Sequence, residues 1–186
     1  MPRKATRSFV QTQTWARGPQ LLQVVHEGSR YNIHILHASI DELRRQISRR
    51  SRGHVHDVYH IVLYTQGAGH FRLNEKLHPF AKGTLVLSGP GDMHDFGAVD
   101  CRASYSEVSF EFRETETGET LPLPFPILLE RIIGCPVEDF VSPRQLDAQT
   151  ASTINDLLIN LVGYLRNSSG FGPFHTCVCL ARVLAL

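Results

Sequence analysis

The amino-acid sequence predicts a mainly β fold, a barrel or a sandwich, followed by α-helices toward the C-terminus. Between residues 54 and 112, short apolar segments alternate with glycine-containing turns, a pattern typical of closed or double-layered antiparallel sheets. After residue 143, apolar residues recur at the spacing of an amphipathic helix. The chain has 186 residues, enough for one domain whose core needs neither disulfides nor metals for stability.

Short segments rich in β-branched and aromatic residues are expected to form the strands of the β part. Turns that contain Gly, Asn or Asp separate most of them. The expected strands cover residues 21–25, 31–37, 54–65, 70–73, 76–80, 84–87, 93–96 and 104–112. The last of these alternates, so that Glu107 and Glu111 share one face of the strand while Phe110 and Phe112 share the other.

One short helix is expected among the strands. Ser39 and Glu42 have the spacing of a capping box, in which two side chains bond to backbone N–H groups at the start of a helix. The helix would continue through Leu43 and Ile47. We therefore expect the second strand to end before Ser39.

The helical part follows a polar segment, residues 115–120, and a proline-rich segment, residues 121–127, which is expected to be extended. One or two helical turns are expected over residues 127–133. Ser142, Pro143 and Gln145 carry the start signal of a long helix over residues 143–166. A last helix is expected over residues 174–186. The chain thus divides into a β domain with an N-terminal segment (residues 1–113) and a linker with a helical segment (residues 114–186).

Composition and charge argue against several classes of protein. The net charge is +1, so the chain lacks the basic surface typical of a nucleic-acid-binding domain. No stretch reaches about 18 consecutive apolar residues, so no membrane-spanning helix is expected. The first ten residues lack the apolar region of a signal peptide, and the four cysteines form no C-x-x-C pair, so we expect a cytoplasmic protein.

Histidine is the one unusual residue type, with ten in the chain, and part of this group forms the candidate site. His54, His56 and His60 share parity, so on one strand their side chains would point to the same face. On an ideal strand His56 and His60 would lie about 13 Å apart, so both reach one ligand only if the strand bends sharply. His94 follows a tight glycine turn in a separate segment.

These histidines lie in two segments that resemble the two motifs of the cupin family. Residues 54–67, HVHDVYHIVLYTQG, resemble the first motif, with His60 in the place of its Glu and Gly67 in register. Residues 83–94, GTLVLSGPGDMH, resemble the second motif, in which Gly83, Gly91 and His94 match. The resemblance covers about residues 50–113 and implies the cupin jelly roll, a double-stranded β-helix.

The cupin resemblance also implies a metal site. Carried over to this sequence, its ligands are His54, His56, His60 and His94. An all-imidazole site suits a divalent transition metal such as zinc, nickel, iron or copper, without selecting among them. Two other interpretations stay open: the same histidines can line a metal-free pocket for a ligand, or they can form no site at all.

The layout of the whole chain resembles the N-terminal half of AraC-type transcription regulators. The resemblance implies that the barrel senses a small-molecule effector, that a helix pairs with its twin in a homodimer, and that DNA is bound only by a C-terminal domain not present in this chain. We expect the native protein to continue past Leu186. The dimer helix would use the apolar stripe of Ile154, Leu157, Leu158, Leu161 and Leu165.

Two alternatives remain at this stage. The apolar stripe can cover the barrel instead of a second copy. The chain can also be a stand-alone metal-dependent cupin enzyme, an oxygenase or isomerase, in which the metal acts as a Lewis acid. Against the enzyme alternative, the four-histidine set contains no carboxylate ligand, and no acid–base residue is evident. Glu107 and Glu111 share a strand face that can point inward, but nothing else selects them.

Overall fold

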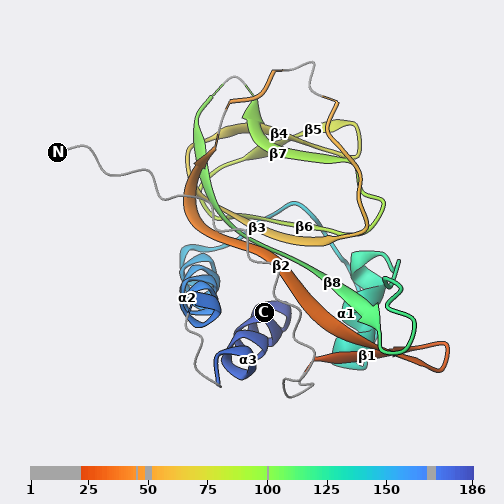
Figure 1. Cartoon of the computed structure of the whole chain (residues 1–186). Coiled ribbons are helices and arrows are strands. Elements are labelled where there is room, and N and C mark those ends of the chain that lie inside the picture. Colours follow the sequence, from red (N-terminus) through yellow and green to blue (C-terminus); the bar gives the residue numbers. More distant parts are fainter. Residues whose placement is uncertain (1–21, 45, 49–51, 100, 167–170) are drawn as a thin grey trace.

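The computed structural model describes residues 22–44, 46–48, 52–99, 101–166 and 171–186, and it has the expected order of strands followed by helices (Figure 1). Its elements are β1 (Gln23–His26), β2 (Ser29–Arg44), β3 (Tyr59–Gln66), β4 (Gly69–Leu73), β5 (Lys76–Phe80), β6 (Thr84–Ser88), β7 (His94–Val99), β8 (Ala103–Glu114), α1 (Phe125–Ile133), β9 (Arg144–Gln145), α2 (Ala148–Arg166) and α3 (Gly172–Leu184). The mainly β class with C-terminal helices is confirmed.

The strands form two antiparallel sheets that face each other. One sheet has six strands in the order β1-β2-β8-β3-β6-β9, and the other has three in the order β5-β4-β7. In Figure 1 the smaller sheet lies over one face of the larger, while α2 and α3 lie against the opposite face. This double-layered antiparallel arrangement is that of the cupin jelly roll.

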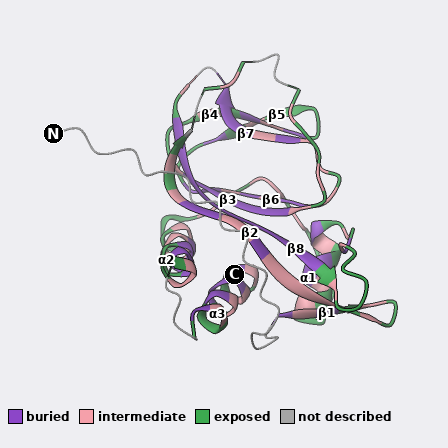
Figure 2. Cartoon of the chain, in the orientation of Figure 1, coloured by how far each residue is buried: buried purple, intermediate pink, exposed green. Residues whose placement is uncertain are grey.

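The two faces of the larger sheet belong to two separate hydrophobic clusters. Between the sheets, Val62 and Tyr64 of β3 pack with Phe71, Phe80 and other residues of the smaller sheet. On the outer face, residues of the opposite parity pack with the helices, and Figure 2 shows this buried layer continuing into α2 and α3. The alternation expected for β8 is confirmed, and its apolar face is the outer one, under the helices.

The helix expected after Ser39 does not occur in the described residues 39–44 and 46–48, and that prediction was wrong. β2 continues to Arg44 and pairs with β8 along its length, with a register shift between Ser39 and Glu42. At the shift Asp41 adopts a φ of 46°, and its backbone N–H donates to the Ser106 hydroxyl. The long-range pairing with β8 therefore overrides the local capping signal, and the bulge breaks the strand where the helix was expected.

The long helix starts later than the sequence signal indicates. Ser142 and Pro143 precede the two-residue strand β9, in which Arg144 pairs with Leu85 of β6. The Ser142 hydroxyl bonds to the backbone of Leu87 instead of capping a helix. α2 begins at Ala148, where the Asp147 carboxylate accepts a bond from the Thr150 N–H at 2.9 Å.

Candidate ligand and metal site

Two of the predicted site residues are held together by backbone pairing. His54 lies before β3, and His94 is the first residue of β7. The His54 N–H donates to the His94 carbonyl at 3.0 Å, and the His94 N–H donates back at 2.9 Å. This antiparallel bridge sets the two imidazole rings 4.5 Å apart, measured between ring centroids.

The other two predicted residues meet because the chain turns before β3. His60 lies on β3, whereas residues 54–58 lie outside it, so the expectation of one continuous strand over residues 54–65 was wrong at its start. The Nε2 atoms of His56 and His60 are 3.3 Å apart. An unbent strand would separate these residues by about 13 Å, so the bend that the sequence analysis required is present.

All four predicted histidines therefore form one group, which we call the histidine cluster: His54, His56, His60 and His94. One ligand atom of each of His54, His56 and His94 lies within 4.8 Å of the others. His60 joins them through its contact with His56. Exposure falls across the cluster from His54, which is exposed, to His94, which is 1% exposed, so the cluster leads from the surface into the barrel.

Neighbouring groups fix the orientation of two rings of the cluster. The Nδ1 atom of His60 lies 2.9 Å from Oε1 of Glu107 on β8. The Nδ1 atom of His94 lies 2.9 Å from the carbonyl of Asp92, and its ring stacks on Phe96 at 4.6 Å. Glu107 thus points inward and contacts the cluster. The sequence had indicated only that Glu107 and Glu111 share a strand face that can point inward.

Several buried polar atoms in and beside the cluster have no hydrogen-bond partner. They are Nε2 of His94, Nδ1 of His56 and Oγ of Ser88, whose residue pairs with His60 across β3 and β6. A buried polar atom without a partner is costly, and native proteins contain few of them. Of these atoms, Nε2 of His94 belongs to a ring that lies 4.5–4.8 Å, between centroids, from each of the other three histidine rings.

Burial keeps two rings of the cluster neutral. Burial, and after it the nearby His60, lowers the pKa of His94 to about 4. The pKa of His56 is also lowered, first by burial and then by His60 and His54. At pH 7 both rings are therefore neutral, which is the form that a metal ion requires.

The residues fit a divalent transition metal. Two imidazole nitrogens bound to one tetrahedral zinc at about 2.0–2.1 Å are separated by about 3.4 Å, close to the 3.3 Å between Nε2 of His56 and of His60. The Nδ1–H of His94 donates to the carbonyl of Asp92, so the lone pair of that ring lies on its unpartnered Nε2. Imidazole donors suit zinc, nickel, copper and iron.

The predicted dimer residues lie elsewhere and have a different environment. The stripe residues Ile154, Leu157, Leu158 and Leu161 are buried in the core formed by the outer sheet face and α3, and Leu165 is partly buried against it. A side chain buried within one chain cannot also face a second copy. This packing favours the alternative in which the stripe covers the barrel, and the dimer role of the stripe stays a prediction.

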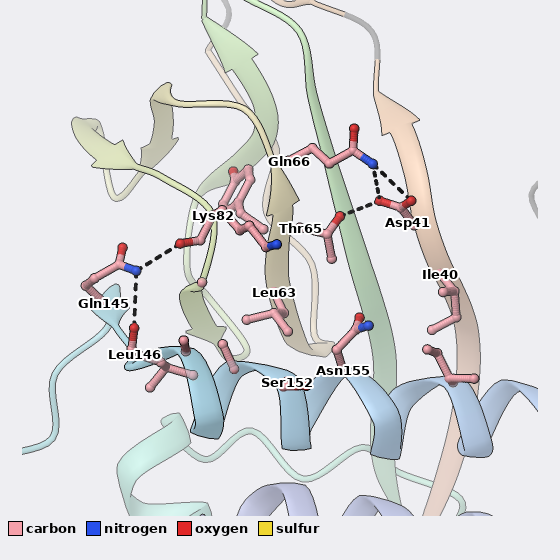
Figure 3. A pocket seen from close by; sticks show the side chains of 15 residues that line it. Ile40, Asp41, Leu63, Thr65, Gln66, Lys82, Gln145, Leu146, Ser152 and Asn155 are labelled. Atoms are coloured by element: carbon pink, nitrogen blue, oxygen red, sulfur yellow. Dashed lines mark hydrogen bonds between the residues drawn. The ribbon is translucent and has the colours of Figure 1, made fainter.

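A cavity that the sequence did not indicate lies between the outer sheet face and α2, away from the histidine cluster (Figure 3). It has a volume of about 1090 Å³. At its rim the Asp41 carboxylate accepts bonds from Thr65 and Gln66, and Asn155 of α2 faces the same space. No sequence signal could indicate it, because its wall depends on the bulge in β2.

Gly53 is expected to be required for the geometry of the cluster. It has a φ of 73°, and a Cβ atom there would lie 2.8 Å from the His94 carbonyl oxygen. Gly91 has a similar φ of 83° but open space around it, so it serves as a matched control for backbone strain alone. We expect Gly53→Ala to lower the unfolding free energy by about 2–3 kcal/mol and Gly91→Ala by about 1 kcal/mol, measured by urea denaturation. Equal losses would show that the contact with His94 is unimportant.

The fold and the site define a cupin-type ligand-binding domain. The chain belongs to the AraC-like ligand binding domain family, whose family model matches residues 41–157. Among solved structures, it is similar to the plu4264 protein from Photorhabdus luminescens, at 15% identity and a TM-score of 0.27, over 55% of this chain and 88% of that one. No curated protein matches. Among the described residues, no helix is long and apolar enough to cross a membrane.

Proposed function

We propose that the chain is the effector-sensing and dimerisation domain of a transcription regulator, and that a small-molecule effector binds at the histidine cluster. The ligand-binding family and the unpartnered buried atoms of His94 and Ser88 support this proposal. Because the net charge is only +1, DNA would be contacted by a separate domain of the regulator. The enzyme alternative has less support, because the family is one of ligand binding.

The cluster would hold a divalent transition metal through the Nε2 atoms of His56, His60 and His94, together with a nitrogen of His54. Such a metal would supply a fixed positive charge that attracts a polar group of the effector, while the four imidazoles themselves fill a tetrahedral ion. The chain itself holds the ligand nitrogens in place, through the backbone bridge between His54 and His94 and the packing of Phe96. His54, the exposed ligand, would lie on the side from which the effector enters.

The single observation that carries the proposal is the buried Nε2 atom of His94, which has no partner. Its test is thermal and chemical unfolding of the full chain with Zn²⁺ and with a library of sugars, aromatic acids and other small metabolites. A ligand at about 100 times its Kd raises the unfolding free energy by about 2.7 kcal/mol. We expect a compound that stabilises the wild type but not His94→Ala. Equal stabilisation of both proteins, or of neither, would contradict the proposal.

The homodimer would form through the exposed face of α3 instead of the α2 stripe. Phe171, Phe174 and Val178 follow one another at helical spacing, and they are 74%, 38% and 37% exposed. Exposed aromatic residues in a row are unusual in a monomer and are enriched in interfaces. A second copy could cover the same residues in a symmetric contact.

Charged substitutions on α3 are expected to separate the dimer. Phe174→Asp combined with Val178→Asp places two like charges on each side of a symmetric contact, so the dimer Kd should rise more than about 100-fold. Sedimentation velocity over a range of concentrations measures this Kd. Ile133→Asp, at an exposed apolar position of α1, is the control and should leave the Kd unchanged. A wild type that is monomeric, or a double variant with the same Kd, would contradict the proposed interface.

A further inference from the structure

We propose that Glu107 is a positioning residue of the histidine cluster, which holds the His60 ring so that its Nε2 atom faces the other three histidines. The inference rests on the proposed function, because it assigns a role within the same site. It concerns a residue on β8, outside both segments that carry the histidines.

The contact between Glu107 and His60 determines which nitrogen of His60 carries the hydrogen. Oε1 of Glu107 lies 2.9 Å from Nδ1 of His60, and the two side chains are buried at 10% and 8% exposure. A carboxylate oxygen accepts, so Nδ1–H is the donor and the lone pair of a neutral ring lies on Nε2. That lone pair then points to the place where Nε2 of His56 lies 3.3 Å away.

The register of the larger sheet makes this contact possible. β3 pairs with β8 so that Val62 faces Glu107 and His60 faces Ser109, which places His60 and Glu107 on the same inward face, diagonally opposed. On that face Ser109 lies directly opposite His60 and next to Glu107 along β8, and Ser88 lies opposite His60 on the other side. Small neighbours on both sides leave room for the two larger side chains to meet.

Glu107 also supplies the negative charge that the cluster itself lacks. The cluster consists of imidazoles only, so a divalent ion bound there would keep its full positive charge in a partly buried place. A carboxylate bonded to a metal-bound imidazole makes that imidazole a stronger ligand and offsets part of the charge. Loss of such a partner weakens metal binding by about 10–100-fold in other proteins.

Glu111 provides a matched control on the same strand and the same face. It is similarly buried, yet its carboxylate bonds to Nε of Arg113 at 2.5 Å. A nonspecific effect of removing a buried carboxylate from β8 should therefore appear in Glu111→Gln as well as in Glu107→Gln.

The first arm of the test measures Zn²⁺ affinity by competition with a chelator. We expect Glu107→Ala to bind about 100-fold more weakly than the wild type and Glu107→Gln, which keeps an acceptor oxygen, about 10-fold more weakly. Glu111→Gln should stay within about twofold of the wild type. A Glu107→Ala variant with wild-type affinity, or equal losses in Glu107→Gln and Glu111→Gln, would overturn the inference.

The second arm reads the His60 ring directly, by ¹⁵N NMR of histidine side chains in the metal-free full chain. We expect the Nδ1–H form in the wild type and a shift toward the Nε2–H form in Glu107→Ala. An Nε2–H form in the wild type would overturn the inference. If the wild type binds no Zn²⁺, the metal part of the proposed function fails, while this second arm still decides the role of Glu107.

Discussion

Replacing His94 with alanine is expected to weaken Zn²⁺ binding by more than about 100-fold, because it removes the most deeply buried ligand of the cluster. Asp92 and Phe96 hold its ring in one orientation inside the barrel. The loss of affinity should exceed that of Glu107→Ala, because three remaining histidines leave one coordination position of the ion unfilled. Isothermal titration calorimetry on chelator-treated protein measures the affinity.

His70→Ala is the control for this prediction. His70 is an exposed histidine on β4 and is not part of the cluster, so its removal should change neither the affinity nor the stoichiometry. The stoichiometry of the wild type should be one ion per chain. If His70→Ala and His94→Ala weaken binding equally, Zn²⁺ binds nonspecifically to surface histidines and the account of the cluster is wrong.

Replacing Leu158 with alanine is expected to lower the unfolding free energy by about 2–5 kcal/mol, the usual cost of a cavity at a buried leucine. Leu158 is 1% exposed and lies in the core between α2, α3 and the outer sheet face. The next residue, Ile159, is 44% exposed, so Ile159→Ala should cost less than about 1 kcal/mol. Urea denaturation at a fixed protein concentration measures both.

The same pair of variants separates the two interpretations of the α2 stripe. If the stripe covers the barrel, Leu158→Ala weakens folding of the single chain and leaves the dimer Kd close to that of the wild type. If the stripe were the dimer interface, Leu158→Ala would weaken the dimer while the chain unfolded at nearly the wild-type denaturant concentration. That second result would restore the interface that the sequence indicated.

The fold class could be predicted because several independent signals agree. Alternation along β8, glycine turns between short apolar segments and two motifs in the correct order all indicate one architecture. The helix expected at Ser39 failed for a physical reason: a capping box is a local signal, whereas residues 39–44 are fixed by pairing with residues 103–107 of β8, far along the chain. Local residue preferences carry no information about a strand so far away in the sequence.

The candidate site was predictable in part. The motif spacing selected the four histidines that the structure brings together, although it could not specify how the chain bends between His56 and His60. The contact of Glu107 depends on the register between β3 and β8, which no single segment reveals. The sequence also could not decide what covers Leu158, because an apolar helix face has the same residue pattern whether a sheet or a second chain packs on it.

The most direct test of the central claim is anomalous X-ray scattering at the zinc edge from crystals of the full chain loaded with one equivalent of Zn²⁺. The account predicts one ion at the barrel entrance, about 2.0–2.1 Å from Nε2 of His56, His60 and His94. An ion held by other residues, or no ion at the cluster in protein that retains its fold, would contradict the claim that this cluster is the ligand site of the domain.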